Sequence, residues 1–281
     1  MQHIEFFDID HFENDYHRVK PGTEIIHFID FFWETKFDDL LQQNPEGFSD
    51  ALFPNIGYTY LINLGTPFIM QVDEKRFEMK SDGFLPRNKS IECFHKPGNR
   101  LFGIKFKVSP VIFEKKVNFS EYREFIYPLS YLLDHEIITK VKRAKDFNER
   151  VAILTAHFQL IVRKHPISLR PVQIVTEILE QCNSTNNFTT PIQTLASKYK
   201  ISTRTLQRYF EITTSISSKQ ALQILRIRKA THQLATCPGN FHFSSYGYYD
   251  KSHFYKHLKR FLQKETLQNL KPHLILLEGL R

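Results

Sequence analysis

Five short segments in the first half of the chain carry β-branched and aromatic residues and are separated by turns rich in Gly, Pro, Asn and Asp. In the last segment, Phe102, Ile104 and Phe106 alternate with Lys105 and Lys107, which is the spacing of a strand with one apolar face. Several short strands at such intervals predict a small antiparallel β-barrel or sandwich. The expected strands cover residues 58–64, 67–72, 76–80, 90–95 and 101–108.

Beyond residue 110 the apolar positions recur at steps of three and four, which predicts helices. A polar, uncharged run at 183–187 follows the last of these helices and indicates a linker. The fold class is therefore α+β. A β-rich domain with flanking helices is expected at 1–166, a helix and polar linker at 167–188, and an all-α domain at 189–281. The helices of the first two regions are expected at 119–133, 136–144, 147–164 and 171–182.

The clearest local pattern begins at Ser202, which is a good helix N-cap because its hydroxyl can accept a bond from an amide of the first turn. Leu206 and Phe210 follow at helical spacing, and the other faces carry Arg, Gln and Thr. A preceding helix starts near Pro191, and its Ala196 allows two helices to cross closely. The pair predicts a helix-turn-helix. The alternative is an ordinary solvated helix face.

The same pattern recurs 48 positions later. Asp250 corresponds to Ser202, Phe254 to Leu206, and Lys256 to a basic residue of the first helix. A repeated capped helix with the same apolar and basic positions predicts two helix-turn-helix units in tandem.

Charge is distributed unevenly along the chain. Residues 189–281 contain 15 Lys and Arg against four Asp and Glu, whereas the first 188 residues contain 23 and 26. A strongly basic module beside a nearly neutral one is typical of a protein with a polyanionic partner on one domain. Double-stranded DNA is the partner that fits the two helix-turn-helix units.

These residues resemble the DNA-binding domain of AraC/XylS-type transcription regulators. The resemblance rests on Leu195-Ala196 followed by Ser202-x-Arg204-x-Leu206-x-Arg208-x-Phe210, on Arg226-x-x-x-Ala230 with Leu234, and on the run 247–254, which reads GYYDKSHF. It implies a cytoplasmic bacterial regulator that places two recognition helices in successive major grooves. The base-facing positions implied are Thr203, Arg204, Gln207 and Arg208 in the first helix, and Lys251, Ser252, Tyr255 and Lys256 in the second.

Several positions depart from that family pattern. The family usually has Gly where Lys200 and Ser215 stand, and the stretch from Leu234 to Gly247 is about two residues shorter than usual. The run 237–240, Cys-Pro-Gly-Asn, also interrupts a helix. We therefore expect the supporting helix of the second unit to be short or distorted, and the first unit to be the principal reader of sequence.

Residues 55–110 resemble the cupin-like amino-terminal domain of some regulators of this class, notably at Leu61-Ile62-Asn63-Leu64-Gly65. This likeness implies a sensor or dimerisation domain. The likeness leaves open whether the protein binds a small-molecule effector, which is unidentified, and whether it forms a homodimer.

An enzymatic function is the less favoured hypothesis. His253 and His257 have the spacing of a zinc pair, but no third ligand follows, so we expect no metal and no cofactor, with His253 packed and His257 at the surface. His27, His95 and His157 lie in apolar segments and are expected in the core. No Gly-rich phosphate loop or nucleophile elbow occurs, which favours a protein that is not an enzyme.

Two alternatives remain from the sequence: a metal-binding cupin-like enzyme, and a weak DNA binder that acts mainly through protein contacts. Three isolated cysteines suit a reducing cytoplasm. The first residues lack a basic leader, and no apolar run is long enough to cross a bilayer, so neither a secretory signal nor a membrane partner is expected.

Overall fold

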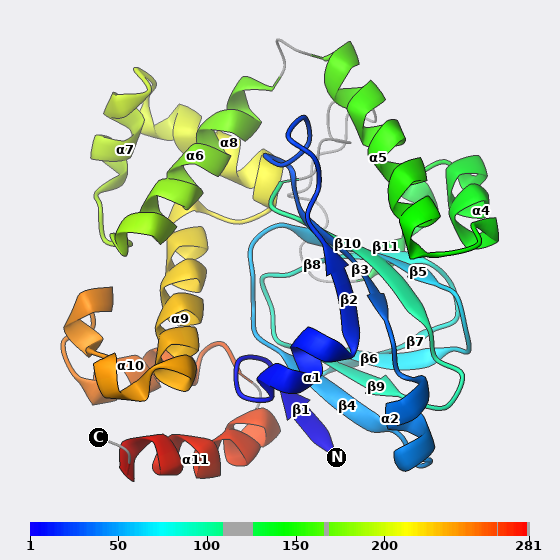
Figure 1. Cartoon of the computed structure of the whole chain (residues 1–281). Helices are drawn as coiled ribbons and strands as arrows, with labels where there is room; N and C mark the ends of the chain where they lie inside the picture. The colour runs from blue at the N-terminus through cyan, green and yellow to red at the C-terminus, as the bar shows by residue number, and fades with distance from the viewer. Residues whose placement is uncertain (109–125, 166–168, 263, 280–281) are drawn as a thin grey trace.

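The first half of the chain folds into two β-sheets and the second half into helices, as a computed structural model of the protein shows (Figure 1). The structure describes residues 1–108, 126–165, 169–262 and 264–279. The α+β fold class expected from the sequence is confirmed. Within the described residues, no helix is both long and apolar enough to span a membrane.

One sheet has five strands in the order β1-β4-β9-β6-β7, and the other has six in the order β11-β8-β5-β10-β3-β2. Neighbouring strands pair antiparallel except β1 and β4, which are parallel. The bounds are β1 Gln2–Ile4, β2 Tyr16–Val19, β3 Ile29–Thr35, β4 Phe48–Leu52, β5 Tyr58–Asn63, β6 Phe68–Val72, β7 Lys75–Met79, β8 Gly83–Pro86, β9 Ile91–His95, β10 Leu101–Phe106 and β11 Tyr127–Pro128.

The two sheets pack face to face. Leu61 and Leu101 of the six-stranded sheet share an apolar cluster with Met70 and Ile91 of the five-stranded sheet. The opposite face of the six-stranded sheet is covered by helices, because Phe106 of β10 meets Phe158 of α5 edge to face. The helices of this half are α1 Ile9–Asn14, α2 Asp38–Gln43, η2 Leu129–Tyr131, α4 His135–Arg143 and α5 Phe147–Lys164.

The helical half begins with α6, whose buried positions pack against α8 and α9. Its helices are α6 Arg170–Thr185, α7 Ile192–Lys198, α8 Thr203–Thr214, α9 Ser218–Thr236, η3 Pro238–Asn240, η4 Phe243–Tyr246, α10 Lys251–Leu258 and α11 Lys264–Gly279. Three residues expected in a polar linker, Asn183, Ser184 and Thr185, belong instead to the last turn of α6. That turn is stabilised by Thr185 Oγ1, which donates to the carbonyl of Gln181 at 2.8 Å.

Most of the expected elements are present. The strands predicted at 58–64, 67–72, 76–80, 90–95 and 101–108 correspond to β5, β6, β7, β9 and β10, and the helix predicted at 147–164 is α5. The helix predicted at 119–133 lies largely outside the described residues, and Leu129–Tyr131 form a short 3-10 turn. The strands β1, β2, β4, β8 and β11 were not anticipated.

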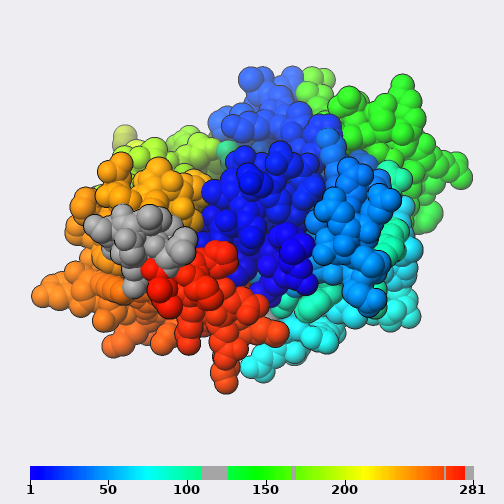
Figure 2. All heavy atoms as spheres, turned by 60° about the horizontal axis from the view of Figure 1, so that its bottom comes forward, coloured from blue at the N-terminus to red at the C-terminus, as the bar shows by residue number. Residues whose placement is uncertain are grey.

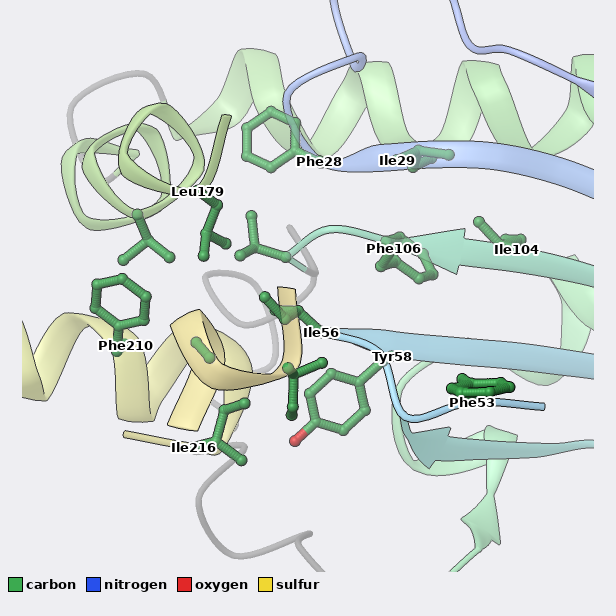
Figure 3. Packing of buried hydrophobic residues seen from close by; sticks show 14 of the residues in the cluster. Phe28, Ile29, Phe53, Ile56, Tyr58, Ile104, Phe106, Leu179, Phe210 and Ile216 are labelled. Atoms are coloured by element: carbon green, nitrogen blue, oxygen red, sulfur yellow. The ribbon is translucent and has the colours of Figure 1, made fainter. Parts of the chain in front are cut away.

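The two halves share one apolar core (Figure 3). Leu179 of α6, Phe210 of α8 and Ile216 belong to the same cluster of buried residues as Phe28 and Ile56 of the sheet half. Phe210 is fully buried. Helix α8 therefore belongs to the same buried core as the β-sheets.

The first residues of the chain also join the halves. Figure 2 shows the amino-terminal segment lying beside α11 on one face of the molecule, and Asn269 of α11 donates to Gln2 Oε1 at 2.6 Å. Phe7 contacts the ring of His273 with 5.6 Å between ring centroids. The amino terminus is thus tied to both halves.

Candidate functional site

The first predicted helix-turn-helix corresponds to α7 and α8, which a short turn joins. Ser202 caps α8 by accepting a bond from the Thr205 amide at 3.0 Å, as the sequence predicted. Leu206 and Phe210 are fully buried, and Ala196 of α7 is buried where the two helices pack. The apolar stripe therefore faces inward, and the polar residues of α8 lie on its other faces.

Of the four positions that the family resemblance implies on α8, three are exposed: Thr203, Arg204 and Arg208. Gln207 is half-buried, and its amide is engaged on both sides. Its Nε2 donates to Glu211 Oε1 at 2.8 Å, and its Oε1 accepts from the Ser218 hydroxyl at 2.9 Å. Gln207 thus joins the start of α9 to α8, and it would have to release these partners to contact a base.

Two turns of this unit adopt left-handed backbone conformations at residues other than glycine. Lys200 has φ of 54° and Ser215 has φ of 64°. These are the two positions at which the resembled family usually has Gly, the residue that adopts this conformation without a steric penalty. Lys200 and Ser215 thus adopt a conformation that Gly would adopt more easily.

The second unit has no regular supporting helix. The chain between α9 and α10 forms the 3-10 turns η3 and η4, which confirms the expectation of a short or distorted segment. Aromatic packing takes the place of helix packing, because the rings of Phe241 and Phe243 lie 6.0 and 5.6 Å from the ring of Phe254. Asp250 caps α10 by accepting a bond from the His253 amide at 2.7 Å.

The predicted residues of α10 divide in a similar way. Lys251, Ser252 and Lys256 are exposed, whereas Tyr255 is half-buried with the ammonium of Lys251 5.7 Å from its ring centroid. Tyr249, one residue before the cap, is 93 % exposed and was not among the expected contacts, although it stands inside the signature run.

The expectation for the two histidines of α10 was wrong. His253 is exposed, and His257 is buried with its Nδ1 2.6 Å from the hydroxyl oxygen of Tyr248. Burial lowers the pKa of His257 to about 4, and the nearby charges of Arg226 and Arg260 act in the same direction. His257 is therefore a core residue that is neutral at pH 7.

Helix α9 separates the two capped helices, and both α8 and α10 pack against it. Its 19 residues span roughly 28 Å at 1.5 Å per residue. The centres of half-sites one turn apart on B-DNA lie about 34–36 Å from each other. Helix α9 alone is therefore shorter than this spacing.

A second candidate site is a cavity of about 260 Å³ between the two sheets. Its walls combine apolar rings, among them Phe6 and Trp33, with the basic side chains of Arg87, Lys105 and Arg228. Arg228 belongs to α9, so the cavity wall includes a residue of the helical half. The sequence analysis did not predict this cavity, because its only local indication was Lys105, a basic residue in an otherwise apolar strand.

The cations of this cavity have few acidic partners. Glu5 accepts from Arg228 Nη2 at 2.8 Å, and Asp30 also lines the wall. Arg87 is 9 % exposed, and its Nε has no hydrogen-bond partner among the described residues. A small molecule with an anionic group would find both a donor and apolar walls here.

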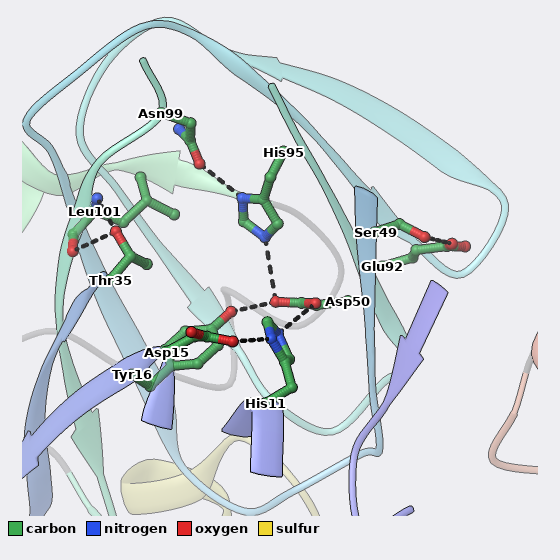
Figure 4. Close-up of polar contacts among 10 residues, drawn as sticks. All are labelled: His11, Asp15, Tyr16, Thr35, Ser49, Asp50, Glu92, His95, Asn99 and Leu101. Atoms are coloured by element: carbon green, nitrogen blue, oxygen red, sulfur yellow. Dashed lines mark hydrogen bonds and ion pairs between the residues drawn. The ribbon is translucent and has the colours of Figure 1, made fainter. Parts of the chain in front are cut away.

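A buried polar cluster lies beside the cavity (Figure 4). The carboxylate of Asp50 lies 2.9 Å from His11 Nε2 and 3.4 Å from His95 Nε2, and it accepts from the hydroxyl of Tyr16. Burial alone raises the pKa of Asp50, but bonds from His11 and His95 hold it well below the usual range. His95 Nδ1 is 2.6 Å from Asn99 Oδ1.

His95 is buried, as expected, and Asn99 engages its Nδ1, but its Nε2 makes only the long contact of 3.4 Å to the carboxylate of Asp50. His27 is exposed and His157 is half-buried, so the same expectation was wrong for His27. Among the described residues, no group of three or more His, Cys, Asp and Glu is arranged to hold a metal ion.

No protein-family model matches the chain, and no curated protein matches it. Solved structures of ToxT from Vibrio cholerae are similar over 76 % of this chain. One, at 1.65 Å, has 10 % identity, a TM-score of 0.40 and 90 % of its own chain covered. The apo form of a point variant has 12 % identity and a TM-score of 0.42, with 89 % of its chain covered. A form bound to an unsaturated fatty acid has 11 % identity and a TM-score of 0.39, with 87 % of its chain covered.

At these identities and TM-scores the likeness alone carries no conclusion about function. The solved structures described here are of ToxT, an AraC-family regulator.

Proposed function

We propose that the protein is a sequence-specific DNA-binding transcription regulator that uses two helix-turn-helix units. The observation that carries the proposal is the pair of capped helices α8 and α10, both packed against α9 and both presenting exposed hydrogen-bond donors. Arg204 and Arg208 are exposed on the first helix, and Lys251 and Lys256 on the second. Arg can form two bonds to guanine, and Lys and Thr reach phosphates.

The distribution of charge supports the same proposal. The 15 Lys and Arg of residues 189–281 face only four acids, whereas the sheet half has a small excess of acids. Neutralising phosphates with such a surface releases condensed counterions, so binding depends steeply on salt.

The proposed contacts are not equivalent. Thr203, Arg204 and Arg208 are free of the packing that engages Gln207, so the first three would read or position the duplex directly. On α10, Lys251, Ser252 and Lys256 would contact the backbone, and the half-buried Tyr255 would contribute less. We add Tyr249 to this set, because its ring is exposed beside the same helix end.

The cavity between the sheets is proposed to be an effector site. Arg228 lines the cavity and lies on α9, the helix that separates α8 from α10. A ligand that contacts Arg228 would therefore act on the element that sets the spacing of the two reading helices. The apolar rings and Arg87 Nε, which has no hydrogen-bond partner in the described part of the chain, favour a small, largely apolar anion.

The test is selection of DNA sequences from a random pool by the full-length protein, followed by binding titrations at two salt concentrations. We expect one enriched motif with two parts about one helical turn apart, and an affinity that falls steeply with salt. The matched control carries Arg204→Ala and Arg208→Ala and should lose the motif while its melting temperature is unchanged.

Recovery of no motif, with an affinity that is flat in salt, would contradict the proposal. A single half-motif would favour the alternative of a weak DNA binder that acts through protein contacts. A metal that co-purifies in stoichiometric amount would favour the alternative of a cupin-like enzyme.

A further inference from the structure

Lys105 is a buried amine in the wall of the cavity between the sheets. It lies on β10, where Phe102, Ile104 and Phe106 point toward the helices and Lys105 points the other way, between the sheets. Only 3 % of the residue is exposed. A lysine in such a place is held by the fold at a considerable cost in desolvation, so its environment indicates a role.

The hydrogen bonds of Lys105 suit a neutral amine. Its Nζ donates to the carbonyl of Phe106 at 2.6 Å and to the carbonyl of Ile56. Among the described residues, no carboxylate lies within ion-pair distance of this nitrogen. A neutral amine has two N–H donors, and two carbonyls satisfy both, so the lone pair stays available.

The surrounding charges favour the same state. Burial lowers the pKa of Lys105 to about 7, Asp30 and Glu5 oppose this effect, and the guanidinium groups of Arg87 and Arg228 add to it. A lysine desolvated beside other cations is the usual arrangement of an amine that attacks carbonyl groups.

We propose that Lys105 captures a carbonyl compound, an aldehyde that also carries a carboxylate, as an imine within the cavity. The inference rests on the proposed ligand pocket and is independent of DNA binding. The carboxylate would meet Arg87, whose buried Nε has no partner among the described residues. The apolar part of the ligand would lie against rings such as Trp33, which line the same cavity.

The reaction needs no oxidant and no reductant. The lone pair of Nζ attacks the carbonyl carbon, and the carbonyl oxygen takes a proton to give a carbinolamine. The hydroxyl of the carbinolamine then takes a proton from solvent, the carbon–oxygen bond breaks, and the oxygen leaves as water with one hydrogen from the amine and one from solvent, while the nitrogen lone pair forms the C=N bond. A protonated imine keeps one N–H, which can donate to the carbonyl of Ile56 or Phe106.

The other nucleophile of the cavity does not compete. Cys93 lines the same wall, but burial raises the pKa of its thiol far above the ordinary value, and the charge of Asp50 acts in the same direction. The thiolate, which is the reactive form, is therefore scarce.

The test is reductive trapping on the full-length protein. 4-Carboxybenzaldehyde is added at a limiting concentration with sodium cyanoborohydride at about pH 7, and the modified lysine is located by peptide mass spectrometry. We expect Lys105 to be labelled about tenfold faster or more than any other lysine, because an ordinary lysine with pKa near 10.4 is almost fully protonated at this pH. The Lys105→Met variant should lose the fast phase and Lys107→Met should keep it.

Two further measurements cover the case in which Lys105→Met does not fold. In the wild-type protein, the labelling rate of Lys105 should level off just above about pH 7, while the rates of surface lysines continue to rise. An excess of 4-(hydroxymethyl)benzoate, which has the carboxylate but no carbonyl, should slow the labelling of Lys105 alone.

Labelling of Lys105 no faster than of Lys107 would overturn the inference. Fast labelling of Lys105 in a protein that binds no DNA would support imine formation and refute the proposed DNA-binding function. DNA binding without fast labelling of Lys105 would refute imine formation and support the proposed DNA-binding function.

Discussion

Arg228 and Glu5, which are 223 residues apart in the chain, form a forked ion pair. Arg228 Nη2 donates to Glu5 Oε1 at 2.8 Å, and Nη1 donates to Oε2 at 3.3 Å. The same guanidinium donates to the carbonyls of Phe53 and Pro54 at 3.2 and 3.1 Å. One side chain of α9 therefore links the amino-terminal segment, the sheet half and the helical half.

Breaking this pair should destabilise the junction of the two halves. We expect a coupling free energy of about 1–3 kcal/mol from a double-mutant cycle with Glu5→Gln and Arg228→Met, because these are charge-assisted bonds in a partly buried place. Urea unfolding of the four proteins measures it. The matched control is the exposed pair of Arg163 and Glu24, for which a surface ion pair predicts less than about 1 kcal/mol.

The same pair should contribute to the pH dependence of stability. Burial alone raises the pKa of Glu5, but the charge and bonds of Arg228 lower it below its ordinary value. Its contribution is therefore present above the unfolded pKa and is lost as the pH falls through the folded pKa. A Glu5→Gln variant that kept the full acid sensitivity of the wild type would contradict this assignment.

Glycine at either left-handed turn position should stabilise the protein. Lys200 and Ser215 both have positive φ, a conformation that strains a residue other than Gly by about 1–2 kcal/mol. Gly removes this strain, but it also makes the unfolded chain more flexible, which offsets part of the gain in stability. We expect Lys200→Gly to raise the free energy of unfolding by several tenths of a kcal/mol up to about 1, as measured by urea unfolding. Gln173→Gly, at an exposed position in α6, should instead cost about 1 kcal/mol.

His257 should make the second unit sensitive to acid. Its pKa is about 4 in the folded protein, against 6.5 for an ordinary histidine, so the unfolded chain binds the extra proton between these values. Stability should thus be full above pH 6.5 and fall as the pH drops toward 4. Thermal unfolding across this range should show a flatter pH profile for His257→Gln, and an unchanged profile for His253→Gln at the exposed position.

The two reading helices should respond differently to loss of a basic side chain. Arg208→Ala should cost about 1–3 kcal/mol of binding and relax the preference at one or two base pairs, as loss of a forked contact does. Lys256→Ala should weaken binding to all sequences alike and lower the salt slope by about one. Titrations on the selected site and on scrambled DNA separate the two effects, with Arg163→Ala in the sheet half as the control.

If Lys256→Ala changed the sequence preference and Arg208→Ala did not, the second unit would be the reader. The irregular segment before α10 would then support a helix that recognises bases.

The elements predicted best were those that local residues determine. Helix α5 was found at its full length, because Asp146 accepts from the Glu149 amide at the start and Leu154, Phe158 and Ile161 form a buried stripe. The cap and stripe of α8 were found for the same reason. Strand propensity did not predict β8, Gly83–Pro86, because Gly and Pro disfavour strands. It did not predict β4 either, because that strand carries Asp50.

The residues around the cavity could not be found because their partners are distant in the chain. Asp50 is tolerated in a strand because His11, Tyr16 and His95 come to it from three other segments. His257 is a different case. Phe254, His257 and Leu258 stand at helical spacing on one face, so the pattern already placed His257 inward, and the expectation of a surface histidine overlooked it.

The core that joins Phe210 and Ile216 to Phe28 and Ile56 has a consequence for how such a protein can diverge. A change of side-chain volume on one half must be answered on the other, because close-packed interiors tolerate neither voids nor overlap. The two halves must therefore evolve together. Recombination that exchanged the helical half between distant relatives would yield a poorly packed chain unless the facing residues of the sheets were exchanged with it.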